Sequence, residues 1–245
     1  MQIEVQTITI NTPTGDMLCQ LYRPKVAGAT FSAILFYSEI FQITAPIARA
    51  AAMLAGQGFL VLVPEIFHEL NPAGTVLAYD DAGKDKGNQD KWQKPLVQHD
   101  SDTQAMLDYL HTRADFNGKT GSYGVCIGGH LAFRAALNPA ISAACCLYAT
   151  DLHSDTLPAT DSVQTLAAAH QINAELCLIW GKQDPHIPTA GRLKIYQALT
   201  DAGCDFSWHE VNAAHAFMRD EGERYDPELA LWVYQQARQL FQRMR

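Results

Sequence analysis

The feature that most constrains this chain is the sequence Gly-Val-Cys-Ile-Gly-Gly at residues 124–129, which follows a β-prone run and precedes small residues at helical spacing. Glycines two positions before and after a central residue permit a very sharp turn between a strand and a helix. Such a turn, a nucleophile elbow, would hold the Cys126 thiol at the edge of a sheet, where a helix dipole favours a thiolate. The motif predicts a reactive cysteine, although a buried structural thiol would fit the same pattern.

Patterning along the rest of the chain predicts an α/β protein. Residues 3–10 and 17–22 alternate between apolar and polar side chains, which indicates an antiparallel hairpin at a sheet edge. Beyond them, short apolar runs alternate with helical stretches, as expected for a mostly parallel sheet covered on both faces. The expected strands are 32–37, 59–63, 143–148, 176–180 and 206–211, and the expected helices are 47–55, 100–111, 187–202 and 227–243.

The chain of 245 residues is predicted to form one domain, 1–245, because no linker, internal repeat or low-complexity tract divides it. Residues 69–95 interrupt the alternation with a polar stretch that contains several glycines and lysines. An excursion of this length in a compact domain is more often functional or partly disordered than idle. We therefore expect either a lid or a disordered insertion at 69–95.

Composition limits the partners and the compartment. The formal net charge of −8 argues against nucleic acid or an anionic membrane as the main partner. No apolar run approaches the roughly 20 residues of a membrane span, and the N-terminus does not resemble a signal peptide. The six cysteines lack zinc-type spacing and mostly lie in apolar runs, which favours free thiols in a reducing cytoplasm. The sequence contains no metal cluster or nucleotide loop, so we expect no cofactor, and it leaves the oligomeric state open.

A catalytic cysteine needs a general base, a group that orients the base, and donors that stabilise an oxyanion. In an open parallel sheet, these groups should follow the carboxyl ends of strands. Asp184 follows the apolar run 176–180, and His215 follows the run 206–211. The order nucleophile, acid, histidine is that of the α/β-hydrolase fold, so the sequence predicts a triad of these residues with Cys126.

Other residues compete for the roles of base and acid. Asp184 could also cap the helix that follows it, and His215 is one of nine histidines in the chain. His186 lies beside the acid, and His209 lies inside a predicted strand. Asp151, which follows the preceding strand, is the alternative acid.

Together with three further motifs, the cysteine elbow resembles the dienelactone hydrolase family of α/β-hydrolases, the carboxymethylenebutenolidases. The resemblance extends over nearly the whole chain. The motifs are Gly-Val-Cys-Ile-Gly-Gly at 124–129, Tyr-Ser-Glu-Ile-Phe at 37–41, Trp-Gly-Lys-Gln-Asp-Pro at 180–185 and His-Ala-Phe-Met-Arg at 215–219. The resemblance implies the α/β-hydrolase fold and hydrolysis of a small ester or lactone.

The resemblance also implies roles for four further residues. Glu39 matches a family glutamate that contacts the resting thiol; a carboxylate there would keep the thiol protonated until substrate displaces it. The backbone N–H groups of Ile40 and Ile127 would form the oxyanion hole, and the second of these also follows from elbow geometry. Arg219 matches a family arginine that pairs with a substrate carboxylate, although it also lies in a charged run typical of a surface.

The sequence departs from the family at two points. Ala216 follows the histidine where a hydroxyl side chain is usual. A second carboxylate-binding arginine has no match, because residues 69–95 contain no arginine. Lys84 or Lys86 are the candidates to replace it. These departures bear on the identity of the substrate more than on the chemistry.

The leading hypothesis is therefore hydrolysis of an ester or lactone through a cysteine nucleophile and an acyl-enzyme. One rival is a cysteine enzyme related to class I amidotransferases, but those carry a His-X-Glu near the C-terminus, where this chain has His-Ala-Phe. A second rival is a protein that binds small molecules on an α/β-hydrolase scaffold without turning them over. An apparently complete triad argues against that second rival.

Overall fold

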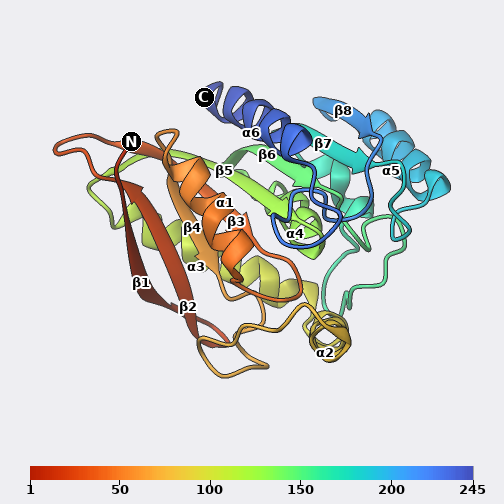
Figure 1. Cartoon of the computed structure of the whole chain (residues 1–245), viewed down its shortest axis with the longest axis horizontal. Helices are drawn as coiled ribbons and strands as arrows, with labels where there is room; N and C mark the ends of the chain where they lie inside the picture. The colour runs from red at the N-terminus through yellow and green to blue at the C-terminus, as the bar shows by residue number, and fades with distance from the viewer. Residues whose placement is uncertain (245) are drawn as a thin grey trace.

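The computed structural model describes residues 1–244, and its centre is one sheet of eight strands (Figure 1). The spatial order of the strands is β1-β2-β4-β3-β5-β6-β7-β8. Their bounds are β1 Ile3–Thr12, β2 Gly15–Pro24, β3 Phe31–Tyr37, β4 Leu60–Pro64, β5 Phe116–Val125, β6 Ile141–Leu147, β7 Glu175–Gly181 and β8 Phe206–Val211. Strand β1 pairs antiparallel with β2, and β2 pairs antiparallel with β4. All pairs from β4 across to β8 are parallel. This confirms the predicted α/β-hydrolase architecture, including the antiparallel hairpin at the sheet edge.

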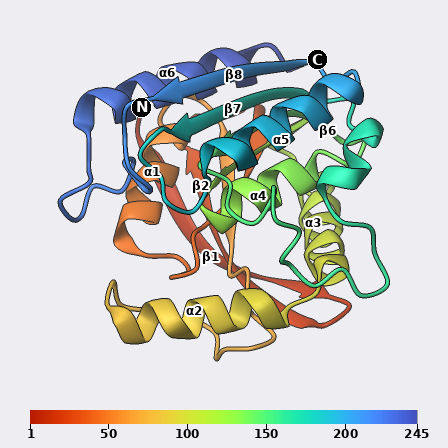
Figure 2. The same cartoon turned by 90° about the vertical axis from the view of Figure 1, so that its right-hand side faces the viewer.

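Helices cover both faces of the sheet, with α1 and α6 on one face and α3, α4 and α5 on the other (Figures 1 and 2). The helices are α1 Ala45–Ala55, α2 Asp81–Gln93, α3 Leu96–His111, α4 Ile127–Ala135, α5 Thr189–Asp201 and α6 Pro227–Gln242, with a 3-10 helix at Leu166–Gln171. The middle strands carry apolar side chains on both faces because each face is buried under helices. No helix within residues 1–244 has the length and apolar character that a bilayer crossing requires.

The register of the parallel strands brings their carboxyl ends to one edge. Tyr37 at the end of β3 lies opposite Gly124 in β5, and Val125 lies opposite Leu147 at the end of β6. Gly181 at the end of β7 pairs in the same way with the last residue of β8. The loops that follow these strands therefore start side by side, and they carry the predicted site residues.

The segment 69–95 differs most from the pattern that the sequence suggests. It contains helix α2, which begins after Asp80, whose side chain accepts a 2.7 Å hydrogen bond from the Gly83 N–H. Helix α2 lies outside the two layers that cover the sheet, beside the carboxyl edge (Figure 2). Its sequence lacks an apolar stripe, because its few buried positions are glycines and charged residues rather than aliphatic side chains. That composition explains why periodicity did not reveal this helix.

Candidate active site

Cys126 occupies the turn between β5 and α4 with backbone angles of φ 59° and ψ −125°. A non-glycine residue with positive φ is strained, and such strain persists only where the surrounding structure holds it. The turn places the cysteine in the lining of a cavity, with the residue largely buried. The geometry is that of a nucleophile elbow.

Two glycines permit this turn because the backbone passes so close to them. A Cβ atom on Gly124 would collide with the carbonyl of Gly128 at the start of α4. A Cβ atom on Gly128 would in turn collide with the carbonyls of Tyr37 and Ser38 at the end of β3. The glycines of the motif therefore allow the strand, the helix and the neighbouring strand to approach one another.

His215 and Asp184 meet although 31 residues separate them in the chain. His215 follows β8 and donates a 2.6 Å hydrogen bond from its Nδ1 to Asp184 Oδ2, which follows β7. The second carboxylate oxygen of Asp184 accepts a 2.8 Å bond from the backbone N–H of His186. With both oxygens engaged, the carboxylate is held in the orientation that fixes the imidazole ring.

The His215 ring is enclosed by two other rings, packed edge-on at centroid distances of 5.0 Å for Tyr148 and 4.7 Å for His186. Burial acts to lower the pKa of His215, but the charge of Cys126 and the bond to Asp184 outweigh it and raise this pKa to about 10. The histidine is thus an imidazolium at neutral pH, adjacent to the cysteine. Its ring lies beside Cys126, the place from which a general base would serve a cysteine nucleophile.

The competing residues have other partners. His209 lies in β8 and packs against Trp232 of α6 at 5.2 Å. Asp151 accepts hydrogen bonds from Lys91 (3.0 Å) and Thr156 (2.6 Å). Neither residue therefore takes the position that His215 or Asp184 occupies.

Glu39 follows β3 and lies in the same cavity, 4% exposed. Its carboxylate accepts a short hydrogen bond from the Tyr79 hydroxyl and lies 3.9 Å from Arg219 Nη1. Burial raises the pKa of Glu39, and Tyr79 and Arg219 offset part of that rise. The hydrogen bond and ion pair of the carboxylate go to Tyr79 and Arg219, while Glu39 and Cys126 line the same cavity. The contact between Glu39 and the thiol stays a prediction.

Tyr79 is a site residue that sequence reasoning missed. It belongs to the segment before α2, and its hydroxyl also bonds Thr44 Oγ1 at 2.7 Å. The Arg219 guanidinium lies over its ring, 4.2 Å from the centroid. No motif marks this tyrosine, because its role depends on how residues 69–95 fold back over the end of β3.

A cavity of about 860 Å³ joins these groups. Its lining includes Cys126, His215, Glu39 and Ile40. One wall comes from α2 and the loop before it, and another comes from the loop after β6. A pocket of this size accommodates a small organic substrate.

Comparison with known proteins decides the family. A sequence model of the "Dienelactone hydrolase family" matches residues 18–245. The chain belongs to the dienelactone hydrolase family. The match includes every position at which the site residues lie.

Individual relatives agree with this assignment. The chain is 40% identical over 222 residues to a "Putative carboxymethylenebutenolidase" of Saccharomyces cerevisiae, covering 86% of this chain and 81% of the relative. It is 26% identical over 201 residues to the "Carboxymethylenebutenolidase" of Pseudomonas putida, covering 81% and 80%. The structure of a "Putative Dienelactone Hydrolase" from Klebsiella pneumoniae superposes with a TM-score of 0.88 at 22% identity, covering 99% of this chain and 100% of the other. That last likeness supports the fold.

In this dienelactone hydrolase family member, the cavity is lined by four lysine and arginine side chains: Lys84, Lys91, Arg219 and Arg224. Lys84 pairs with Asp81 at 2.7 Å, and Lys91 pairs with Asp151. Lys86, the other lysine considered as a replacement for the second family arginine, does not line the cavity and pairs with Asp90. Of the two lysines suggested by sequence, the structure therefore places only Lys84 at the cavity.

In the described part of the chain, residues 1–244, one side-chain cluster has ligand atoms close enough together to bind a metal ion: His68, Glu69 and Asp102. The ammonium of Lys94, fully buried, lies 2.7 Å from Glu69 and 2.5 Å from Asp102. Burial acts to lower the pKa of His68, but hydrogen bonds to the two carboxylates outweigh it and raise this pKa to about 9. The two carboxylates are thus already neutralised by two cationic side chains, so this cluster does not fit a metal ion.

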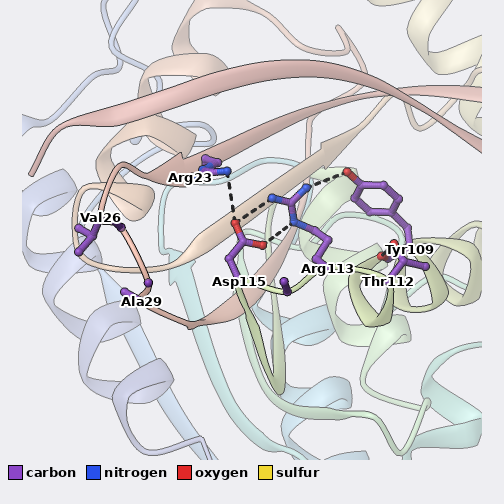
Figure 3. Close-up of a pocket in the computed structure, with 10 residues that line it drawn as sticks. Arg23, Val26, Ala29, Tyr109, Thr112, Arg113 and Asp115 are labelled. Carbon is purple, nitrogen blue, oxygen red and sulfur yellow. Dashed lines mark hydrogen bonds and ion pairs between the residues drawn. The ribbon is translucent and has the colours of Figure 1, made fainter.

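A second hollow of about 500 Å³ lies at the opposite end of the sheet, near the amino ends of β3 and β5. Figure 3 shows that its charged side chains bind one another: Arg113 donates to Asp115 at 2.8 and 2.9 Å and to the Tyr109 hydroxyl at 3.0 Å. Arg23 lies 3.7 Å from the same aspartate. These paired charges account for the hollow as a structural feature, distinct from the site of Cys126.

Proposed function

We propose that this protein hydrolyses an activated ester or lactone through a Cys126–His215–Asp184 triad. The observation that carries the proposal is the position of His215, bonded to Asp184 at 2.6 Å and paired electrostatically with Cys126 in one cavity. Membership of the dienelactone hydrolase family, with relatives called carboxymethylenebutenolidases, supports the same activity.

In the first half of the reaction, the thiolate adds to the substrate carbonyl carbon, and the carbonyl oxygen becomes an oxyanion. The N–H groups of Ile40 and Ile127 are the proposed donors to that oxygen. Ile127 is the first residue of α4, so its N–H has no acceptor inside the helix. Collapse of the tetrahedral species breaks the bond to the leaving oxygen, which takes the proton from His215, and leaves a thioester on Cys126.

In the second half, His215 is neutral because it has given up its proton. It removes a proton from water, which attacks the thioester and releases the carboxylic acid and the thiolate. Asp184 keeps the ring oriented throughout and stabilises the imidazolium that forms again. The proton that leaves His215 in acylation therefore returns to it in hydrolysis.

The substrate class follows from the nucleophile. A thiolate is also a good leaving group, so an ordinary alkoxide would be expelled less readily from the tetrahedral species than the thiolate itself. An enol ester, an aryl ester or an enol-lactone has a more stable leaving oxyanion and drives the reaction forward. We therefore propose an activated ester or lactone in preference to a peptide.

Arg219 is the proposed partner of a substrate carboxylate. Its buried Nε has no hydrogen-bond partner within residues 1–244, and its guanidinium contacts the carboxylate of Glu39. A substrate carboxylate would compete with Glu39 for this guanidinium. The proposed role of Glu39 is to lose its contact with Arg219 when that carboxylate binds. Arg224, from the same loop, lines the cavity and is the best placed second cation.

The test is turnover of a dienelactone and of p-nitrophenyl acetate by the wild type and by Cys126→Ala. We expect loss of at least about 10³-fold in kcat in the variant, since removing a triad nucleophile leaves only binding and oxyanion stabilisation. Cys204→Ala is the matched control, because this thiol lies outside the cavity. Turnover in Cys126→Ala that equals the wild type would refute the proposal.

The same samples separate the enzyme from its rivals. Intact-mass detection of an acyl adduct on Cys126 supports an enzyme, whereas stoichiometric binding without any adduct supports a binding protein. Release of ammonia from glutamine would support the amidotransferase hypothesis, which the family assignment disfavours.

The proposed location is the cytoplasm. All six cysteines are free, and five are buried. A nucleophilic thiol survives best where the surroundings keep it reduced.

A further inference from the structure

The proposed oxyanion donor Ile40 lies in a turn whose backbone is fixed from both sides. On one side, the carbonyl of Glu39 accepts a 3.0 Å hydrogen bond from the N–H of Gln42, which has a φ of 70°. The Glu39 carbonyl and the Ile40 N–H belong to the same planar trans peptide, so they point in opposite directions. The bond to Gln42 therefore directs the Ile40 N–H away from the turn.

On the other side, the carbonyl of Ile40 lies against Gly87 of α2. A Cβ atom on Gly87 would stand 2.6 Å from the Ile40 oxygen and 2.9 Å from its Cβ, closer than real contacts allow. Gly87 is one of the few buried residues of this otherwise exposed helix. Its missing side chain is what lets α2 pack directly on the peptide that follows Ile40.

The segment before α2 binds the same turn at other points. The Leu77 N–H donates a 3.1 Å bond to the Phe41 carbonyl, and the rings of Phe41 and Tyr79 pack edge-on at 4.8 Å. The Tyr79 hydroxyl bonds Thr44 at the far end of the turn. Residues 77–87 thus enclose residues 39–44, and Gly87 is the point where they meet the oxyanion donor.

We infer that Gly87 is a positioning residue for the oxyanion hole. Its contact with Ile40 lets the packing of α2 set the direction of the Ile40 N–H. The inference rests on the proposed role of Ile40 in catalysis. It assigns helix α2 a function beyond forming a wall of the cavity, because displacement of α2 would remove an oxyanion donor while leaving the thiol and its histidine in place.

The test compares two reactions of Cys126 in Gly87→Ala. Acylation by p-nitrophenyl acetate develops an oxyanion, whereas alkylation by iodoacetamide does not. We expect acylation to slow at least about tenfold. Complete loss of one oxyanion donor would lower the rate by about 10²–10³-fold. Alkylation should stay within about twofold of wild type, since its transition state makes no use of the Ile40 N–H. The alanine favours a helix and α2 is mostly exposed, so the variant is expected to fold.

Gln89→Ala is the control. Gln89 lies two residues after Gly87 on the exposed part of α2 and does not line the cavity. We expect its acylation rate to remain close to wild type. Equal acylation by Gly87→Ala and wild type, or equal slowing by both variants of α2, would overturn the inference. Absence of acylation in the wild type would instead refute the proposed function.

Discussion

At the scale of single residues, backbone strain is concentrated in the loops at the carboxyl edge of the sheet. Five non-glycine residues with positive φ follow or end strands at the carboxyl edge of the sheet: Gln42, Cys126, Tyr148, Asp151 and Ala216. Such conformations cost free energy and persist where the surroundings over-determine them. Ala216, at φ 61°, directly follows His215 and thereby helps to set the direction of the imidazole.

The raised pKa of His215 predicts that its charge supports the reactivity of Cys126. With a pKa of about 10, His215 carries a positive charge at neutral pH. A cation beside a thiol makes the thiol more reactive towards electrophiles. We therefore expect His215→Gln to slow the alkylation of Cys126 by iodoacetamide at neutral pH by at least about tenfold.

His215→Gln retains a polar side chain beside Asp184 but supplies no cation. His170→Gln is the control, because His170 is exposed and does not line the cavity. Its alkylation rate should match the wild type. An unchanged rate in His215→Gln would show that another group makes the thiol reactive.

At the scale of elements, the segment that carries α2 is anchored at both of its ends. Glu69 and Lys94 form a 2.7 Å ion pair that joins the two ends of the excursion, and Asp102 of α3 binds the same ammonium. A third anchor, the pair of Lys91 with Asp151, connects the end of α2 to the loop after β6. Helix α2 has little apolar surface of its own, so these buried ion pairs add to the packing of Gly87 on Ile40 in positioning it.

This anchoring predicts a pH-dependent stability. His68 has a pKa of about 9 in the folded protein against about 6.5 when unfolded, so its charged form stabilises the fold fully below about pH 6.5. That contribution is lost as the pH rises through about 9. We expect His68→Gln to lower the free energy of unfolding by about 1–3 kcal/mol at about pH 6 and by much less at about pH 9.5.

Urea denaturation at several pH values measures this difference. His111→Gln serves as the control, because this histidine lies at the end of the same helix α3 to which Asp102 belongs, and its ring bonds only the carbonyl of Leu107. A difference between His68→Gln and wild type that does not shrink as the pH rises would show that His68 stabilises the fold without its charge.

At the scale of the whole molecule, helix α6 covers the strand that leads to the elbow. Phe241 of α6, 2% exposed, packs over Gly121 of β5, where a Cβ atom would come within 2.7 Å of its ring. It also packs against Phe59, which precedes β4 (6.0 Å between centroids). The C-terminal helix thus covers the strand that leads to Cys126, although it contributes no group to the cavity.

Removing this aromatic side chain should therefore affect stability and not chemistry. We expect Phe241→Ala to lower the free energy of unfolding by about 3–5 kcal/mol, the usual cost of a cavity in a core. Leu231→Ala in the same helix should change it little, since Leu231 is 60% exposed. Denaturant unfolding measures both, and kcat per folded molecule should match the wild type. An equal effect of the two variants would contradict this role of Phe241.

Much of the fold was predictable because its strands and helices bury regular apolar patterns. The hairpin, the buried strands and most helices lie within a few residues of their expected bounds, although α3 begins at Leu96 and not near 100. Helix α2 was not predicted, since buried glycines and ion pairs stabilise it and neither leaves a periodic signal. The partners of Glu39 were not predicted either, because Tyr79 reaches it from 40 residues away.

By itself, the sequence determined the elbow at residues 124–129, the chain order of cysteine, aspartate and histidine, and the family. Local sterics dictate a turn that only glycines allow, and parallel strands bring the loops at their carboxyl ends to one edge of the sheet. Only the tertiary structure decided which cations line the cavity, where the carboxylate of Glu39 points, and that α2 packs on Ile40 through Gly87. The physical reason is that these contacts join segments far apart in the chain, whose meeting depends on packing and on buried charge rather than on any local pattern.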